Sequence, residues 1–342
     1  MFVCVGRQSA VPTGAENRAA ADDRQGQVDR RQAATGATLV GGVKKVRNAI
    51  GLRALMNALT RTYAVLGALL LAAAAPALQA LEPVSALRMY VLDGGSMTIG
   101  DMALFSDSGK YDGQAGSIVD PCFLIRHPKG ILLWDTGLSD SYLGHDAPPN
   151  ADRVAIHVER GLLPQLAALG ITPADITYVA FSHLHVDHTG NANAFTASTW
   201  ILNQAELDWA MGTPTPRVVV PATFSEYRSV RTIMIQGDYD VFGDGSVRIL
   251  KTPGHTPGHQ VLLLKLPKSG PVLLSGDLYH LRADRPHDGT GAQVMVVNVS
   301  RADTLASMDR VEDLIRNLHA RLIVQHDPAD FRRLPQAPAY LD

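Results

Sequence analysis

Cysteine is scarce in this sequence, and its scarcity excludes stabilisation by a disulfide within the molecule. The 342 residues contain two cysteines, Cys4 and Cys122. Cys4 lies in an N-terminal stretch that we expect to be absent from the mature chain, which leaves Cys122 alone. An exported chain without a cysteine pair cannot form an intramolecular disulfide. The fold must therefore be stabilised by core packing or by bound ions.

Long hydrophobic runs are also lacking. The apolar run at residues 63–75 is broken by Pro76 and is too short to span a membrane. Arg61 precedes this run and small residues follow it as far as Ala80, which is the layout of a secretory signal peptide. The alternative is a buried apolar helix at the N-terminus.

The N-terminal pattern predicts three segments. Residues 1–55 form a disordered extension or result from a mis-assigned start, because they are rich in small and polar residues without a sustained period. Residues 56–80 form the signal peptide, with cleavage after Ala77 or Ala80. Residues 81–342 form one folded domain. We therefore expect an exported protein, either periplasmic or secreted, with no stable membrane association after cleavage.

Positive charge is scarce in the predicted domain. Residues 81–342 carry a net charge of −8, whereas residues 1–80 carry +6. A domain without a basic stripe has nothing to pair with a phosphate backbone, which excludes nucleic acid as a partner and argues against a nuclease. The sequence does not specify an oligomeric state, and a homodimer stays open.

Internal repeats and low-complexity segments are absent from residues 81–342, and segments with strand and helix patterns alternate instead. The predicted strands lie at 118–125, 131–134, 178–181, 200–203, 232–236, 247–251, 260–266, 272–275 and 322–325. The predicted helices lie at 154–169, 205–211 and 301–318. This alternation predicts an α/β fold with sheets inside and helices outside.

Potential metal ligands are concentrated at residues 183–188, which read His-Leu-His-Val-Asp-His. The segment directly follows a predicted strand, so His183 and His185 project to one side while Asp187 and His188 turn towards a second ion. Imidazole and carboxylate ligands suit a borderline divalent cation such as zinc. A lone histidine more often has a structural role than a metal-binding one. Four ligand-type side chains in six positions are not explained by structural roles.

Three further candidate ligands each lie just past a predicted hydrophobic strand. They are His255 in Thr-Pro-Gly-His-Thr-Pro-Gly-His, Asp277 in Ser-Gly-Asp, and His326 in Gln-His-Asp. Because every one of them follows a strand end, all can converge at one rim of a sheet sandwich. His259 ends the first of these motifs, and we expect it to order the loop rather than to bind metal.

This ordered set, HxHxDH followed by His, Asp and His, resembles the signature of the metallo-β-lactamase superfamily over essentially all of residues 81–342. The resemblance implies a four-layer αββα sandwich and a site for two metal ions. It implies that the first metal is held by His183, His185 and His255. The second metal would be held by Asp187, His188 and His326, and Asp277 would bridge the two. It also implies that Asp135 supports a ligand histidine through a hydrogen bond.

The predicted activity is metal-dependent hydrolysis. Two divalent ions, most simply Zn²⁺, about 3.5–4 Å apart would share a hydroxide and lower its pKa towards 7. That hydroxide would attack an electrophilic carbon or phosphorus, and Asp187 would orient it and return a proton to the leaving oxygen. No Gly-x-Ser-x-Gly stretch for a serine nucleophile is present.

Within the superfamily, the chain resembles the N-acyl-homoserine lactonases, which open the lactone ring of quorum-sensing signals. The resemblance is carried by residues 122–138, 183–191, 252–260 and 325–331. In several such enzymes a tyrosine shortly after the bridging Asp bonds the substrate. Tyr279 lies two residues past Asp277 rather than the three expected, so we predict Tyr279 as a catalytic contact and keep His280 as its rival.

The segment that enters the domain is predicted to wall an acyl-chain pocket. Its apolar candidates are Met97, Ile99, Met102, Leu104 and Phe105. The alternative is that these side chains cap the core. In either case the expected partner is a small-molecule ester or lactone.

Other functions are weaker predictions. The nearest alternative is a phosphotriesterase resembling the methyl parathion hydrolases, which share export, size and a two-metal site. β-Lactamases usually carry another ligand, often cysteine, where Asp277 stands, and hydroxyacylglutathione hydrolases carry a basic tail that is not seen here. A redox di-iron protein would need a flavin domain, and a binding module would not need all seven ligands.

Overall fold

The computed structural model describes residues 83–147, 149–150, 153–285 and 294–342. The chain divides into a unit of residues 1–75 and a second unit that ends at Asp342. The predicted extension and signal peptide lie outside the described residues, so the account below concerns the second unit. In the part of the chain that the structure describes, no helix is long and apolar enough to cross a membrane.

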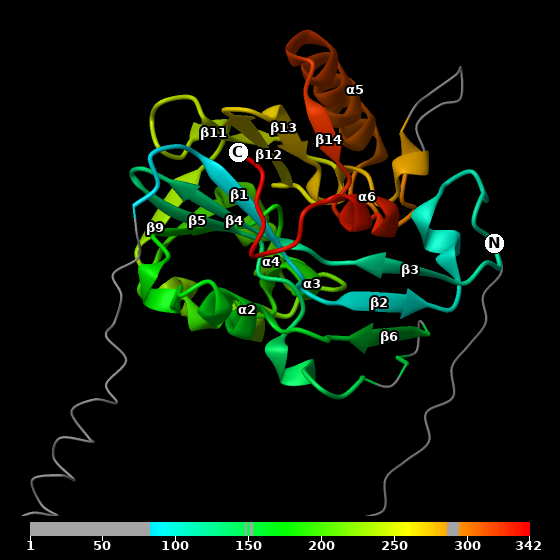
Figure 1. Ribbon diagram of the computed structural model, residues 1–342. Coiled ribbons are helices and arrows are strands. Elements are labelled where there is room, and N and C mark those ends of the chain that lie inside the picture. Colours follow the sequence, from blue (N-terminus) through cyan, green and yellow to red (C-terminus); the bar gives the residue numbers. More distant parts are fainter. Residues whose placement is uncertain (1–82, 148, 151–152, 286–293) are drawn as a thin grey trace, which may run out of the picture. The chain divides into compact units, whose positions relative to one another are not determined.

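Two large sheets face one another in this unit (Figure 1). The first has the order β1-β4-β5-β7-β8-β9, with β1 (Arg88–Leu92), β4 (Cys122–His127), β5 (Gly130–Trp134), β7 (Tyr178–Ala180), β8 (Thr199–Asn203) and β9 (Thr232–Ile235). The second has the order β10-β11-β12-β13-β14, with β10 (Tyr239–Asp240), β11 (Val247–Lys251), β12 (Gln260–Leu266), β13 (Gly270–Leu274) and β14 (Arg321–Ile323).

Both faces of each large sheet are buried, because successive side chains of a strand point to opposite faces. In β4, Phe123 joins the apolar cluster between the sheets, whereas Leu124 joins the cluster on the outer face. The helices α2 (Leu162–Ala168) and α4 (Gln204–Ala210) cover that outer face, and α5 (Arg301–Leu318) covers the second sheet (Figure 1). The predicted four-layer αββα sandwich is confirmed.

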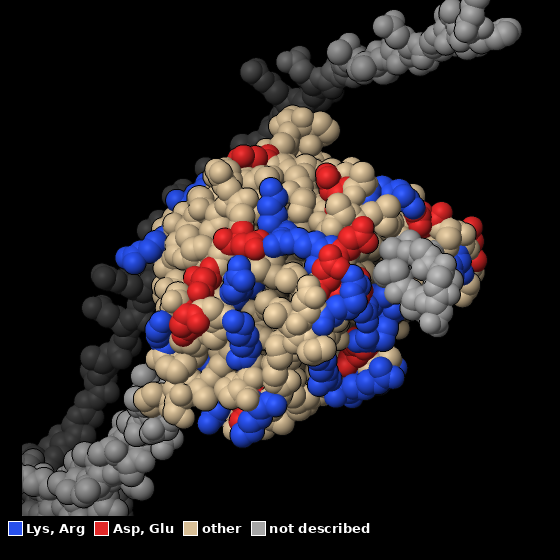
Figure 2. Space-filling model, turned by 90° about the horizontal axis from the view of Figure 1, so that it is seen from above, with Lys and Arg blue, Asp and Glu red and all other residues tan. Residues whose placement is uncertain are grey.

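A third, smaller sheet extends beyond the sandwich (Figure 1). Its antiparallel order is β3-β2-β6, with β3 (Gly116–Val119), β2 (Ser96–Ile99) and β6 (Val154–His157). Two short helices, α3 (Val186–Thr189) and α6 (Pro328–Arg333), follow β7 and β14. On the face drawn in Figure 2, Lys and Arg side chains lie among Asp and Glu side chains.

Two element predictions are wrong at this small sheet. The predicted strand 118–125 is two strands, β3 and β4, which separate at Asp120-Pro121 because proline has no N–H for a ladder bond. The predicted helix 154–169 begins as β6, and α2 starts only after Gly161, whose φ of +58° turns the chain.

Candidate metal centre

The strand directions bring the predicted ligands to one edge of the sandwich. β5 runs parallel to β7, β13 runs parallel to β14, and β11 runs with β13 because both are antiparallel to β12. Each predicted ligand or support follows the carboxyl end of one of these strands: Asp135 after β5, His183 after β7, His255 after β11, Asp277 after β13 and His326 after β14.

The first ligand group consists of His183, His185, His255 and Asp277. Nδ1 of His185 lies 2.8 Å from Nε2 of His183 and 3.1 Å from Nε2 of His255. Oδ2 of Asp277 lies 3.6 Å and 3.3 Å from the same two Nε2 atoms. Donor atoms around a tetrahedral zinc lie about 3.3 Å apart. The spacing therefore fits four donors around one cation.

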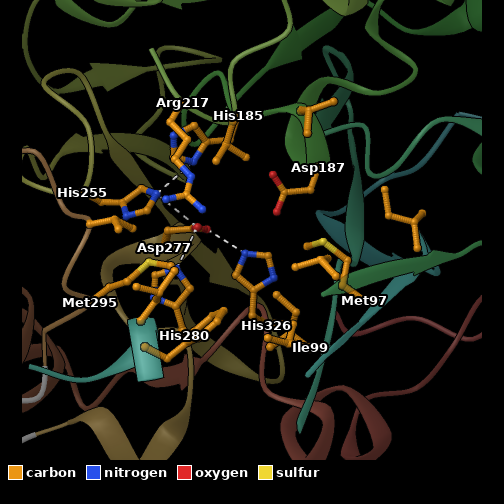
Figure 3. A pocket seen from close by; sticks show the side chains of 18 of the residues that line it. Met97, Ile99, His185, Asp187, Arg217, His255, Asp277, His280, Met295 and His326 are labelled. Atoms are coloured by element: carbon orange, nitrogen blue, oxygen red, sulfur yellow. Dashed lines mark hydrogen bonds and ion pairs between the residues drawn. The ribbon is translucent and has the colours of Figure 1, made fainter. Parts of the chain in front are cut away.

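The second ligand group consists of Asp187, His188 and His326. Oδ1 of Asp277 lies 3.1 Å from Nε2 of His188 and 2.9 Å from Nε2 of His326. One oxygen of Asp277 thus faces each group, and its carboxylate lies at the centre of the site (Figure 3). This places Asp277 where a bridging ligand belongs.

Unpartnered atoms in the second group test whether these residues fit a cation. Among the described residues, Oδ1 of Asp187 is buried without a hydrogen-bond partner, and Nε2 of His188 forms no hydrogen bond although it lies 3.1 Å from Oδ1 of Asp277. Leaving such a group unsatisfied costs about 1–3 kcal/mol, whereas a metal ion would use both atoms. Together with the imidazole and carboxylate donors, this observation shows that the residues fit divalent metal ions.

Electrostatics prepare the first group for metal binding. Burial lowers the pKa of His183 and His255 well below the usual value, and that of His185 to about 4. All three rings are therefore neutral at pH 7 and offer a lone pair. Burial would raise the pKa of Asp277, but the positive charge of His326 and His188, whose own pKa values are raised, outweighs it and holds the pKa of Asp277 well below its usual range.

A carboxylate on the far side of the His188 ring fixes the orientation of this ligand histidine. Asp135 Oδ2 lies 3.1 Å from Nδ1 of His188, as the family resemblance implied. The other oxygen of Asp135 accepts the N–H of Ser182 at 2.7 Å, and Oδ2 also accepts from Gln325 at 2.6 Å. Asp135 thus holds a ligand ring and is itself held on both sides.

His259 stays out of the ligand set, as predicted. Its Nδ1–H donates to the carbonyl of Thr252 at 3.0 Å, and its Nε2 accepts the N–H of Asp277 at 2.9 Å. Burial lowers its pKa to about 4, so the ring is neutral and has one donor and one acceptor. Gly276 permits this contact, since a Cβ there would lie 2.6 Å from Nε2 and its φ is +49°.

A cavity of about 210 Å³ opens onto both ligand groups. Five of the seven metal-ligand residues form its floor together with His280 (Figure 3), namely His185, Asp187, His255, Asp277 and His326. Its walls are largely apolar and come from the small sheet, the turn at residues 102–105 and the segment 295–297. The predicted pocket residues Met97, Ile99, Leu104 and Phe105 line it, together with Ile118, Val154, Ile156 and Met295.

The predicted pocket role of Met102 is wrong. Met102 is buried in the apolar cluster of the small sheet, and it occupies the space that Gly116 leaves, where a Cβ would lie 2.9 Å from Met102 Cγ. Its neighbours in the same turn, Leu104 and Phe105, point to the cavity instead. The side of the cavity near His185 carries Arg217 (Figure 3) and Val218, whose φ of +67° is strained for a β-branched residue.

Comparison with known proteins identifies the family. The Metallo-beta-lactamase superfamily model matches residues 120–326. The N-acyl homoserine lactonase AttM of Azorhizobium caulinodans is 32% identical over 270 residues, which cover 75% of this chain and 99% of that protein. The chain belongs to the metallo-beta-lactamase superfamily.

Solved structures show the same metallo-beta-lactamase fold. A variant of AiiA from B. thuringiensis with N-decanoyl-L-homoserine bound at its active site is 23% identical and has a TM-score of 0.65, with 75% of this chain and 100% of that chain covered. AidC, described as a dizinc quorum-quenching lactonase, is 17% identical and has a TM-score of 0.53, with 72% and 90% covered. At these identities the likeness is one of fold.

The superfamily pattern misled one prediction, that of Tyr279 as the substrate contact. Its hydroxyl donates to Glu312 at 3.1 Å, away from the cavity, and the ring is buried among apolar residues under α5. His280 lies at the cavity instead, with Nε2 3.1 Å from Oδ2 of Asp277 and its ring edge-on to Phe105. A turn of the chain at 276–278 directs successive side chains to opposite sides.

Two supporting residues of this metallo-beta-lactamase site are missing from the sequence prediction. Asp120 pairs with Nδ1 of His326 at 3.0 Å, and Asn298 Oδ1 lies 2.8 Å from Nδ1 of His255. Asp120 stands just past a strand, so the rule that found the ligands could have found it. Asn298 lies 43 residues from its partner in an irregular segment, and only the fold reveals it.

Proposed function

We propose that this protein is an N-acyl-homoserine lactonase that uses two divalent metal ions, with zinc in both positions. AttM supports the substrate class, because it is named for this activity and matches the chain over nearly its whole length. The two ligand groups, which share Asp277, support the number of ions. The donor set of five imidazoles and two carboxylates suits zinc.

The observation that carries this proposal is the pairing of an apolar wall with a metal-ligand floor in one cavity. An N-acyl-homoserine lactone has an apolar acyl chain joined to a polar ring, so its two ends match the two surfaces. The acyl chain would lie along Met97, Ile99 and Phe105, and the lactone would lie against the ligand residues.

Asp187 is the residue of the chain that handles the proton in this reaction. When bound, the metal ions would lower the pKa of a water molecule and polarise the lactone carbonyl. Asp187 lines the cavity, and its buried Oδ1 has no partner among the described residues. It takes the proton of the attacking water and delivers it to the ring oxygen as the C–O bond breaks.

A substrate panel tests the proposed function. Zinc-loaded protein should open the rings of N-acyl-homoserine lactones, with one proton released per turnover in a pH-stat assay, and longer acyl chains should lower KM. Simple lactones and paraoxon are run beside them, and the Asp277→Ala variant serves as the inactive control. Hydrolysis of paraoxon without ring opening would replace the lactonase proposal with the phosphotriesterase alternative.

We further propose that the protein is exported. Residues 56–80 support this proposal, because a basic segment, an apolar run and a stretch of small residues follow one another there. In a bacterium with an intact export system, the product should be found outside the cytoplasm and begin between Leu78 and Leu81. N-terminal sequencing that finds Met1 or Met56 on active protein would contradict it.

A further inference from the structure

Glu206 is a buried carboxylate that joins two of the loops that carry metal ligands. It lies in α4 and is 2% exposed. Oε1 accepts the backbone N–H of Leu184 at 2.9 Å, and Oε2 accepts the backbone N–H of Gly258 at 2.9 Å. The loop with Leu184 follows β7 of the first sheet, and the loop with Gly258 joins β11 to β12 of the second sheet. A single side chain therefore connects the two sheets at the edge that carries the metal ligands.

The two N–H groups belong to the loops of the first ligand group. Leu184 stands between His183 and His185, and Gly258 follows His255 by three residues. The second group has other supports, because Asp135 orients His188, and the carbonyl of Val119 holds Nδ1 of His326 at 2.8 Å with Asp120 beside it. Glu206 therefore bonds the backbone beside the three imidazoles of the first metal position, and Leu184 lies nearer in sequence to His183 and His185 than to His188.

α4 and the loop that carries His255 are in close backbone contact at Gly258. A Cβ on Gly258 would lie 2.4 Å from the backbone nitrogen of Glu206 and 2.6 Å from Oδ1 of Asn203. Asn203 caps α4, accepting the N–H of Ala205 at 3.0 Å, and so fixes where the helix begins. The carboxylate of Glu206 is thus presented from a rigid position.

We propose that Glu206 is a positioning residue for the first metal ion. It sets the separation between the His183–His185 segment and His255, and through that separation the affinity of the ion, without touching metal or substrate. The two oxygens of the side chain matter because both N–H donors need an acceptor. A glutamine would offer one oxygen and turn its NH₂ towards the second N–H, so it would keep one loop and release the other. The inference rests on the proposed two-metal centre and not on the lactone substrate.

Site-resolved metal binding tests the proposal. The wild-type chain, Glu206→Ala and Glu206→Gln are loaded with zinc and equilibrated with graded concentrations of a chelator. Anomalous scattering from crystals at the zinc edge then gives the occupancy of each position, and titration in solution gives the affinities. In Glu206→Ala the first position should lose about tenfold to a hundredfold in affinity, the range usual for residues that hold metal ligands. Glu206→Gln should lose less, and the second position should change less than threefold in both.

Asp135→Asn is the matched control, because it disturbs the support of His188 and should weaken the second position instead. Equal weakening of both positions in the Glu206 variants, or a lower melting temperature with unchanged occupancies, would overturn the proposal, since a purely structural role predicts those results. Glu206→Gln carries the test if Glu206→Ala does not fold. A wild-type chain that holds no zinc at either position would overturn the metal centre itself, which is a different result.

Discussion

The backbone N–H of Asp277 donates a hydrogen bond of 2.9 Å to Nε2 of His259, a ring that is completely buried. Since Nδ1–H of the same ring donates to the carbonyl of Thr252, His259 joins the loop that carries His255 to the turn that carries Asp277. The imidazole thus holds the backbone of Asp277 on the side away from the cavity, and both of its nitrogens are used in doing so.

Replacing His259 should therefore damage the site without removing a ligand. His259→Ala leaves the N–H of Asp277 and the carbonyl of Thr252 unsatisfied, at about 1–3 kcal/mol for each group. We expect a lower free energy of unfolding and weaker metal binding at both positions, measured by denaturant titration and elemental analysis. A variant with full metal content and unchanged stability would contradict this role.

The wild-type chain should carry close to two divalent ions. Asp277→Ala should lower the occupancy of both positions together, because one carboxylate oxygen faces each ligand group. His326→Ala, which removes a ligand from the second group alone, is the comparison variant. Elemental analysis that finds at most one ion in active wild-type protein would rule out the two-metal centre.

Asp187→Asn separates proton transfer from metal binding. The amide keeps an oxygen ligand but cannot carry a proton, so kcat for lactone opening should fall at least about 10²-fold. On paraoxon, whose leaving group departs without protonation, the loss should be much smaller. Equal losses on both substrates that follow the metal content would mean that Asp187 is a ligand only.

His280 and Tyr279 should respond differently to substitution by phenylalanine. His280→Phe removes a polar group that faces the cavity beside Asp277, so KM for the lactone should rise. Tyr279→Phe removes a hydroxyl bonded to Glu312, so it should cost about 1 kcal/mol of stability and leave kcat/KM unchanged. Steady-state kinetics on the pair decide the assignment, and the opposite pattern would restore Tyr279.

Acidification should reveal the ion pair between Glu312 and Arg285, whose side chains lie 2.7 Å apart. Burial would raise the pKa of Glu312, but the hydrogen bonds and charge of Arg285 outweigh it and lower that pKa. The ion pair therefore adds its full free energy of stabilisation above pH 4.5, the ordinary pKa of the carboxyl. This stabilisation is lost as the pH falls through the lowered pKa of Glu312 in the folded protein. Glu312→Gln should cost about 2 kcal/mol at pH 7 and progressively less towards pH 3. Denaturant titrations that give the same difference in free energy of unfolding between wild type and Glu312→Gln at every pH would contradict this.

The sequence predicted the ligand residues because each follows a strand whose apolar pattern marks its end. His183, Asp277 and His326 are of this kind, whereas their division into two metal groups came from the family resemblance. The same reasoning failed over 154–169, because apolar residues at 154 and 156 suit a helix or a strand equally, and Gly161 was not recognised as the turn between the two.

Side-chain direction within turns was beyond the reach of sequence patterns. Tyr279 and His280 are neighbours, and only the course of the turn at 276–278 decides which one faces the cavity. Glu206 shows the same limit more strongly. It bonds residues 22 and 52 positions away, so its place beside two loops follows from the docking of both sheets.

The small sheet β3-β2-β6 provides one wall of the cavity, whereas the sandwich provides the floor. The side chains of Met97, Ile99 and Ile156 belong to the wall, and none of them supports a ligand histidine; this sheet holds His326 only through the backbone carbonyl of Val119. Selection can therefore reshape the wall, and with it the range of molecules admitted, while the reaction centre stays as it is. A protein divided in this way can acquire new substrates by small steps, each of which leaves a working enzyme.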